Sequence, residues 1–162
     1  METAGVYDMY IKTSGKPFRF DKKLCKEALK FYAKLLISDC IYNKITISLE
    51  FDASLCSTND YAYCYYQYDY HNPTSRVFTI SIDPNLSKKD ALLALAHEMV
   101  HVKQYSKGEL KDYLRANKTK WCGQLVEADR MDYWDLPWEI EAHGREKGMY
   151  LKFIQSQRTS NR

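Results

Sequence analysis

The segment from residue 91 to residue 105 constrains the fold more than any other part of the chain. It reads A-L-L-A-L-A-H-E-M-V-H-V-K-Q-Y, and its first half is apolar nearly all round. A helix without a polar face has to be surrounded by the rest of its domain, so we expect a central, buried helix. Ser87 and Asp90 resemble a capping box at its start, and Gly108 is suited to end it.

His97, Glu98 and His101 form the pattern H-E-x-x-H within this helix. Positions i and i+4 lie on one helix face, so both imidazoles can bind a single Zn²⁺ ion. Glu98 lies on the flank of that face, where a carboxylate can take a proton from a metal-bound water. Burying these ionisable groups without a partner is costly, and a metal ion would offset the cost. The pattern therefore predicts a zinc site.

A catalytic zinc ion needs a third protein ligand and an open position for water. The segment 135–144, D-L-P-W-E-I-E-A-H-G, offers Glu139, Glu141 and His143. Pro137 is tolerated in the first turn of a helix, and in that register Glu139 and His143 share a face. Glu141 lies about 200° round from Glu139, so the two cannot face one metal ion. We expect Glu139 to be the third ligand, with Glu141 and His143 as the alternatives.

Other polar residues near these candidates have ordinary structural explanations. His71 lies in the turn sequence H-N-P-T, where a solvated loop residue is expected. Glu141 and Arg145 form an i,i+4 pair of the kind that usually decorates a surface. Gly144 and Gly148 would let a neighbouring element approach closely. We therefore expect the last helix to pack its small-residue side against the H-E-x-x-H helix.

The remaining sequence alternates between helical and strand patterns, which predicts an α+β domain. Alternating apolar residues and a tyrosine-rich stretch favour strands that precede the central helix. The simplest arrangement is a small, mainly antiparallel sheet with a hairpin at its end. We expect helices over 21–38, 87–107 and 137–155, strands over 45–51, 61–70 and 76–83, and short extended pieces within 119–134.

Length and composition favour a single domain over the whole chain, 1–162, with a flexible polar tail at 156–162. No apolar run approaches the roughly eighteen residues that span a bilayer, and no signal peptide is evident, so we expect no membrane partner. The five cysteines are scattered and contain no C-x-x-C pair, which favours reduced thiols in a cytoplasm. The net charge of +3, from 24 basic and 21 acidic side chains, is too balanced to favour a nucleic-acid ligand.

The two motifs together resemble the gluzincin branch of zinc metallopeptidases, and more narrowly its small members encoded by phages and bacteria. H-E-M-V-H is followed by P-W-E-I-E-A-H, whose Glu139 comes 38 residues after His101. The resemblance covers about residues 76–150, and its first motif is the more specific. It implies a zincin-like fold, zinc ligands His97, His101 and Glu139, and Glu98 as general base. In several such families an acidic residue one turn beyond the glutamate supports a histidine ligand, and here that position holds His143.

This resemblance implies zinc-dependent hydrolysis of a peptide or protein substrate, in the cytoplasm of a bacterial cell or phage-infected host. The oxyanion that develops during the reaction needs a donor, and the candidates are His143, Tyr105, Tyr133 and Tyr150. Two alternatives remain. One is a non-catalytic metal-binding interaction module, in which a fourth protein ligand closes the site. The other is an SprT-like protease acting on DNA-associated proteins, with His143 as third ligand.

Overall fold

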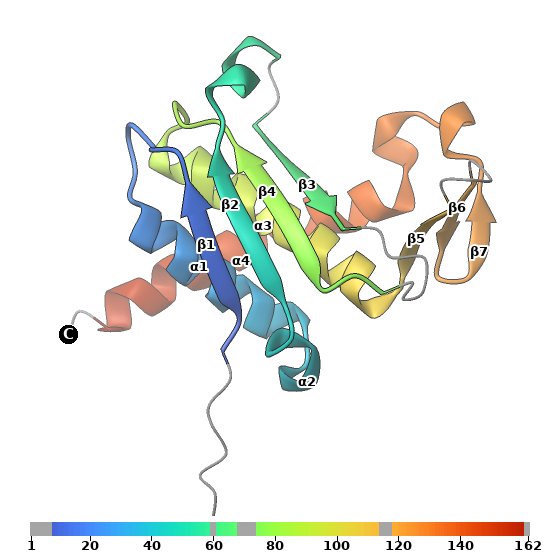
Figure 1. Ribbon diagram of the computed structural model, residues 1–162, viewed down its shortest axis with the longest axis horizontal. Helices are drawn as coiled ribbons and strands as arrows, with labels where there is room; N and C mark the ends of the chain where they lie inside the picture. The colour runs from blue at the N-terminus through green and yellow to red at the C-terminus, as the bar shows by residue number, and fades with distance from the viewer. Residues whose placement is uncertain (1–7, 59–60, 68–73, 114–117, 161–162) are drawn as a thin grey trace, which may run out of the picture.

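The computed structural model describes residues 8–58, 61–67, 74–113 and 118–160, and it confirms an α+β architecture. The helices are α1 (Lys22–Leu36), α2 (Asp39–Tyr42), α3 (Lys88–Lys107) and α4 (Pro137–Ser160), with short 3-10 helices η1 (Ala53–Ser57), η3 (Ala128–Arg130) and η4 (Tyr133–Asp135). The strands are β1 (Tyr10–Ser14), β2 (Thr46–Phe51), β3 (Ala62–Tyr66), β4 (Val77–Ile82), β5 (Leu110–Tyr113), β6 (Lys118–Trp121) and β7 (Gln124–Val126). The long helices cover one face of the larger sheet (Figure 1).

The larger sheet has the strand order β1-β2-β4-β3 and is mixed. β1 pairs parallel to β2 and β2 parallel to β4, and only β3 runs antiparallel to its neighbour β4. The prediction of a mainly antiparallel sheet is therefore wrong here, although the predicted pairing of β3 with β4 at the edge is confirmed. The cause is β1, a strand that was not predicted: α1 returns the chain to the same end of the sheet, which makes β2 parallel to β1. His71 lies outside the described residues.

A second, smaller sheet joins α3 to α4 and accounts for the extended pieces expected in this region. Its order is β5-β6-β7, and both pairs are antiparallel. Cys122 and Gly123 form the two-residue turn between β6 and β7, with φ of 47° and 85°. Positive φ at both positions is the conformation of a tight hairpin turn. The chain then passes through η3 and η4 before it enters α4 (Figure 1).

α3 is the buried central helix that its apolar pattern predicts. Leu92, Leu95 and Ala96 are almost fully buried, and the helix packs against α1, α4 and the sheet. The Ser87 hydroxyl accepts a hydrogen bond from the amide of Asp90 at 3.1 Å, and Gly108 ends the helix in the left-handed conformation. Both predicted caps are therefore confirmed.

α4 packs through a different side from the one that its glycines suggested. Ala142, Met149 and Phe153 are buried in the core, whereas Gly144 and Gly148 are exposed, with open space where a side chain would stand. The predicted small-residue contact with α3 is therefore wrong, because large apolar side chains provide more buried area than glycines do. Residues 156–160, the first part of the predicted polar tail, continue the helix to Ser160.

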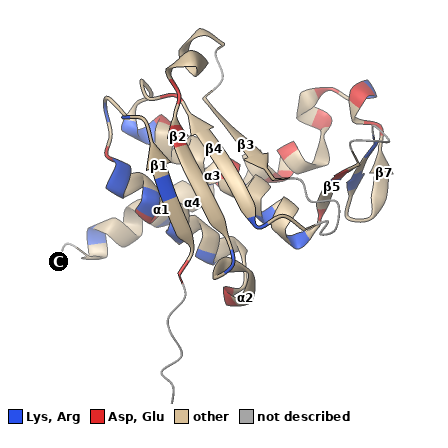
Figure 2. Cartoon of the chain, in the orientation of Figure 1, with Lys and Arg blue, Asp and Glu red and all other residues tan. Residues whose placement is uncertain are grey.

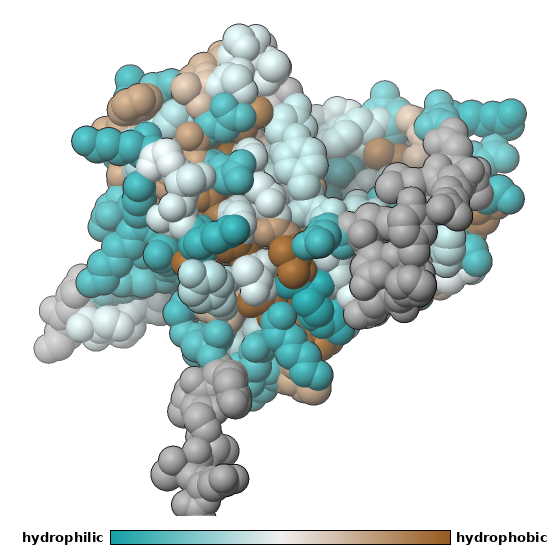
Figure 3. Space-filling view, in the orientation of Figure 1, coloured by the Kyte–Doolittle hydropathy of each residue, from teal (hydrophilic) through white to brown (hydrophobic). Residues whose placement is uncertain are grey.

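Two further observations concern the cysteines and the hydrophobic segments. All five cysteines are free thiols. In the part of the chain that the structure describes, no helix has the length and apolar character needed to cross a membrane. On the face drawn in Figure 3, hydrophobic residues lie mostly in small groups among hydrophilic ones.

Phe153 provides a test of how α4 is held in the domain. Its ring is 1% exposed and lies 5.5 Å from the ring of Phe31 and 5.7 Å from that of Tyr32. Truncation leaves a cavity between α1 and α4, so Phe153→Ala is expected to lower the free energy of unfolding by about 3–5 kcal/mol in urea titration. Leu151→Ala is the matched control on the exposed side of the same helix, with an expected loss below about 1 kcal/mol. Equal losses would contradict this packing.

Candidate metal centre

His97 and His101 present their Nε2 atoms to one another from successive turns of α3. The two atoms lie 3.1 Å apart, and both side chains are nearly buried, with about a tenth of their surface exposed. Helical spacing alone accounts for this arrangement, because i and i+4 positions share a face. The predicted histidine pair is therefore brought together.

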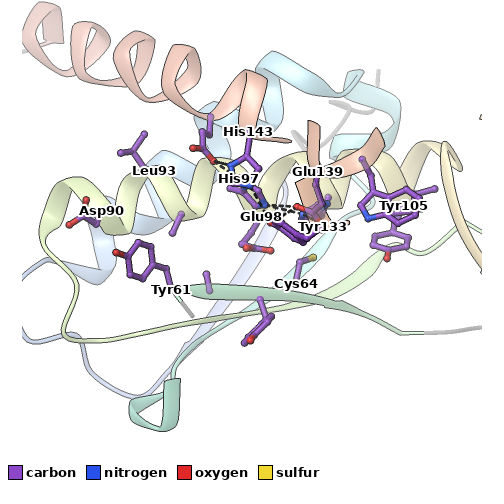
Figure 4. A pocket seen from close by; sticks show the side chains of 17 residues that line it. Tyr61, Cys64, Asp90, Leu93, His97, Glu98, Tyr105, Tyr133, Glu139 and His143 are labelled. Atoms are coloured by element: carbon purple, nitrogen blue, oxygen red, sulfur yellow. Dashed lines mark hydrogen bonds and ion pairs between the residues drawn. The ribbon is translucent and has the colours of Figure 1, made fainter. Parts of the chain in front are cut away.

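Glu139 reaches the histidine pair from the first turn of α4. Its Oε2 lies 3.2 Å from His97 Nε2, and its Oε1 lies 3.5 Å from His101 Nε2. One ligand atom from each of the three residues fits within a 4.8 Å cluster. Figure 4 shows Glu139 and His97 facing one another across the gap between α4 and α3. The structure thus places together the three residues that the sequence singles out as ligands.

Glu141, one of the alternatives for the third ligand, lies on another side of α4. It accepts hydrogen bonds from Lys103 Nζ at 2.5 Å and Gln104 Nε2 at 3.0 Å, and from Arg145 Nε at 2.9 Å. The predicted pair with Arg145 is confirmed, but the carboxylate is mostly buried rather than on an open surface. Glu141 therefore helps to fix α4 on α3 and does not approach the histidine pair.

His143, the other alternative, lies at the rim of the cluster. Its Nε2 is 3.2 Å from the hydroxyl of Tyr133, and its Nδ1 is 3.4 Å from Glu146 Oε2. Its ring also lies 4.9 Å from the ring of Trp134, which is exposed. With His97 and Glu146 it forms a second group of possible ligands, which does not include His101. His143 therefore lines the pocket beside the first group without belonging to it.

Two residues that the sequence did not single out orient the histidines. Glu146 Oε2 lies 2.8 Å from His97 Nδ1, and Gln104 Oε1 lies 2.9 Å from His101 Nδ1. Since Gln104 Nε2 donates to two other acceptors, Oε1 is the atom that faces His101 and accepts its Nδ1 proton. A proton on Nδ1 leaves the Nε2 lone pair free for a metal, which is the usual role of such partners. Helical spacing places both residues on the same faces as the ligand candidates, because Glu146 lies two turns beyond Glu139 and Gln104 lies three residues beyond His101.

The two imidazole nitrogens and the carboxylate have a geometry that fits Zn²⁺. Two imidazole nitrogens whose lone pairs converge at 3.1 Å, with a carboxylate beside them, require a positive charge between them. Two histidines and one carboxylate leave one tetrahedral position for water or substrate. The residues that would hold the ion are therefore His97, His101 and Glu139.

Glu98 lies beside this cluster with no partner of its own. Its side chain is 6% exposed, and none of the residues described by the structure donates a hydrogen bond to it or forms an ion pair with it. Burial raises the pKa of this carboxyl group, and the nearby His101 and His97 oppose that rise. A buried carboxylate with a raised pKa beside an open metal position is suited to act as a general base.

The cluster opens into a pocket of about 530 Å³, within the usual range for a ligand site. α3 forms its floor, β3 one wall, and α4 with η4 the other. His97, His101, Glu98, Glu139, Tyr133 and His143 all line it. The site is therefore accessible to a ligand rather than sealed in the core.

Without a metal, protons take its place in the cluster. Burial lowers the pKa of His97, but hydrogen bonds with Glu139 and Glu146 outweigh it and raise the pKa to about 9. Burial also raises the pKa of Glu139, and the hydrogen bonds from His101 and His97 more than reverse this, leaving it well below its usual range. An imidazolium held by two carboxylates is thus the metal-free state of the site.

We expect the metal-free protein to keep a proton on His97 up to a pH of about 9. Because this pKa is raised above 6.5, the stabilisation is fully present below pH 6.5 and is lost as the pH rises through 9. NMR titration of the His97 imidazole in the presence of a chelator measures the midpoint. A midpoint at or below pH 6.5 would contradict the proposed hydrogen bonds, and Glu146→Gln should shift it downward.

Metal analysis distinguishes the candidates for the third ligand. Glu139→Ala is expected to weaken zinc binding by at least about tenfold, since the carboxylate oxygen that would bind the ion is lost. Glu141→Gln removes the charge of a carboxylate on another side of the same helix but keeps an oxygen for Lys103 and Arg145, and it should retain zinc. The measurement is zinc affinity by competition with a chromophoric chelator, and the opposite order of the two variants would show that Glu141 is the ligand.

Comparisons with family models, with curated proteins and with solved structures find no match to this chain. What the protein does is therefore inferred from the chemistry of this site alone.

Proposed function

We propose that the protein is a zinc-dependent peptidase with a zincin-like fold, which hydrolyses peptide bonds in a peptide or protein substrate. One observation carries the proposal: His97, His101 and Glu139 converge beside the buried, unpartnered Glu98 in an open pocket. The arrangement supports the gluzincin resemblance that the two sequence motifs suggest.

When bound, the zinc ion would supply a Lewis acid that polarises the scissile carbonyl and acidifies a water molecule. Glu98 then takes the proton of the attacking water and passes it to the leaving amine. Its raised pKa suits both transfers, because a carboxyl group that is too acidic would be a poor base and would not keep the proton for donation. Glu146 and Gln104 hold the histidine rings in place throughout.

Tyr133 and His143 are the candidates that the pocket offers for stabilising the developing oxyanion. Both line the pocket, and the Tyr133 hydroxyl lies 2.7 Å from Glu139 Oε2 and 3.2 Å from His143 Nε2. Tyr105 also lines the pocket, but its hydroxyl donates to Asp112 at 3.1 Å, whereas the hydroxyl of Tyr133 donates to Glu139, a member of the ligand group itself. Tyr150 is not among the residues that line it. The geometry thus favours Tyr133 with His143 at its side.

The alternatives have less support from the site. An SprT-like site would need His143 in the place of Glu139, but the group of possible ligands that contains both His97 and His101 has Glu139 as its third member. A closed, non-catalytic zinc site would need a fourth protein ligand. Among the described residues, the ligand group at His101 contains only three members.

Glu98→Gln tests the proposed general base. The variant keeps the size of the side chain and should retain zinc at the level of the wild type, while kcat falls by about 10²–10⁴-fold on a casein or peptide-library substrate. Zinc content and cleavage are measured on the same preparations. Turnover equal to that of the wild type would rule out Glu98 as the base, and no cleavage by any zinc-loaded wild-type preparation would contradict the peptidase proposal.

Tyr133→Phe tests the proposed oxyanion donor. Removal of the hydroxyl is expected to lower kcat by about 10²-fold with little change in KM, because the lost hydrogen bond is made in the transition state. Tyr105→Phe is the matched control, since it removes a hydroxyl from the same pocket that is already held by Asp112. If the two variants lose the same kcat, the hydroxyl of Tyr133 has no special role.

A further inference from the structure

The pocket extends along α3 well beyond the metal cluster. Figure 4 shows Asp90, Tyr61 and Leu93 at one end and Tyr105 at the other, with His97 and Glu98 between them. Asp90 precedes His97 by seven residues, or two turns, which is about 10 Å along the axis. An extended peptide advances about 3.3 Å per residue, so this end of the pocket accommodates roughly three residues of a substrate.

Among the described residues, the pocket is lined by four carboxylates and by no lysine or arginine. They are Asp90, Glu98, Glu139 and Glu146. A bound divalent ion would balance the formal charges of Glu98 and Glu139, and Glu146 accepts a hydrogen bond from His97. Asp90 is therefore the carboxylate for which the metal centre provides no counter-charge. Lysines and arginines gather instead on α1 and other outer elements (Figure 2).

Asp90 has an oxygen available to a ligand. Its Oδ2 accepts a hydrogen bond from the Ser87 hydroxyl at 2.6 Å, as part of the helix cap. Its other oxygen has no partner among the residues that the structure describes. The helix cap uses one oxygen of Asp90, and the other oxygen can accept a hydrogen bond from a ligand in the pocket.

The wall between Asp90 and His97 is apolar. Leu93 and Ala94 occupy the next turn of the same helix face, and both are only partly buried. Lys and Arg side chains lay their methylene stems along apolar surfaces and keep the charged head at a polar end. An apolar path that ends at a carboxylate therefore matches a basic side chain in shape and in charge. Glu98, which is buried and has no partner among the described residues, lines the same pocket beside this wall.

We propose that this end of the pocket is a subsite for a Lys or Arg side chain, so that the enzyme selects peptides with a basic residue within three positions of the scissile bond. This inference rests on the proposed peptidase function for its catalytic consequence. The subsite itself predicts a binding preference that does not depend on cleavage. A substrate with Glu at the same position would instead meet an unbalanced negative charge.

The test uses labelled ten-residue peptides that are uncharged except for one Lys, Gln or Glu, moved through three positions on each side of the centre. Binding is measured by fluorescence anisotropy on zinc-loaded Glu98→Gln, and cleavage is measured on the zinc-loaded wild type. At one position we expect the Lys peptide to exceed the Glu peptide by about tenfold in affinity and in kcat/KM. Raising the salt concentration should reduce this ratio.

Asp90→Asn, made in each background, should bring the Lys-to-Glu ratio close to one, and Asp90→Lys should reverse it. Asn retains an oxygen for the Ser87 hydroxyl, and thermal unfolding checks that the helix cap survives. Asp39→Asn, which removes a carboxylate from α2 outside the pocket lining, is the control and should leave the ratio unchanged.

The outcomes separate the two proposals. Cleavage without a charge preference, or a preference that Asp90→Asn leaves intact, would overturn the basic subsite alone. Charge-selective binding without any cleavage would overturn the peptidase and retain the subsite. Failure of every peptide to bind and to be cleaved would contradict both.

Discussion

The contact between Gln104 and the first turn of α4 is the interaction on which the rest of the site depends. The fully buried Gln104 amide donates to the carbonyl of Trp138 and to the carboxylate of Glu141, and its oxygen accepts the Nδ1 proton of His101. Trp138 immediately precedes Glu139, so the bond that docks α4 also sets the position of the third ligand candidate. One side chain thus couples the packing of two helices to the orientation of a histidine.

The ionisable groups of the site are buried, which carries a free-energy cost. His97, Glu98 and Glu139 are each less than a tenth exposed, and leaving such groups without compensation is costly. The core provides what the site needs: α3 is held by apolar contacts on several sides, so its histidines can face inward without loosening the fold. In the metal-free protein a proton shared with two carboxylates compensates the charge, and in the proposed enzyme a zinc ion does so. The same arrangement keeps an open position in front of Glu98, which a closed structural site would lack.

The sequence allowed prediction of those parts of the molecule that depend on local pattern. The α+β class, the burial and the caps of α3, and the convergence of His97, His101 and Glu139 all follow from helical periodicity and helix-start chemistry. Parallel pairing of β1 with β2 is set by a non-local crossover, and no residue pattern within either strand records it. The spacing of Gly144 and Gly148 does not predict the packing side of α4, because Met149 and Phe153 bury a larger apolar area on a different side. Glu146 and Gln104 escaped notice because polar residues at helical spacing are common on surfaces, and only the docked helices reveal their partners.

X-ray absorption at the zinc edge of the zinc-loaded protein tests the central claim most directly. The proposed site predicts one zinc ion per chain, with two imidazoles at about 2.0–2.1 Å, oxygen ligands from a carboxylate and a solvent molecule, and no sulfur. Loss of one oxygen ligand in Glu139→Ala would complete the assignment. A first shell containing a sulfur ligand near 2.3 Å or a third imidazole, or the absence of stoichiometric zinc, would contradict it.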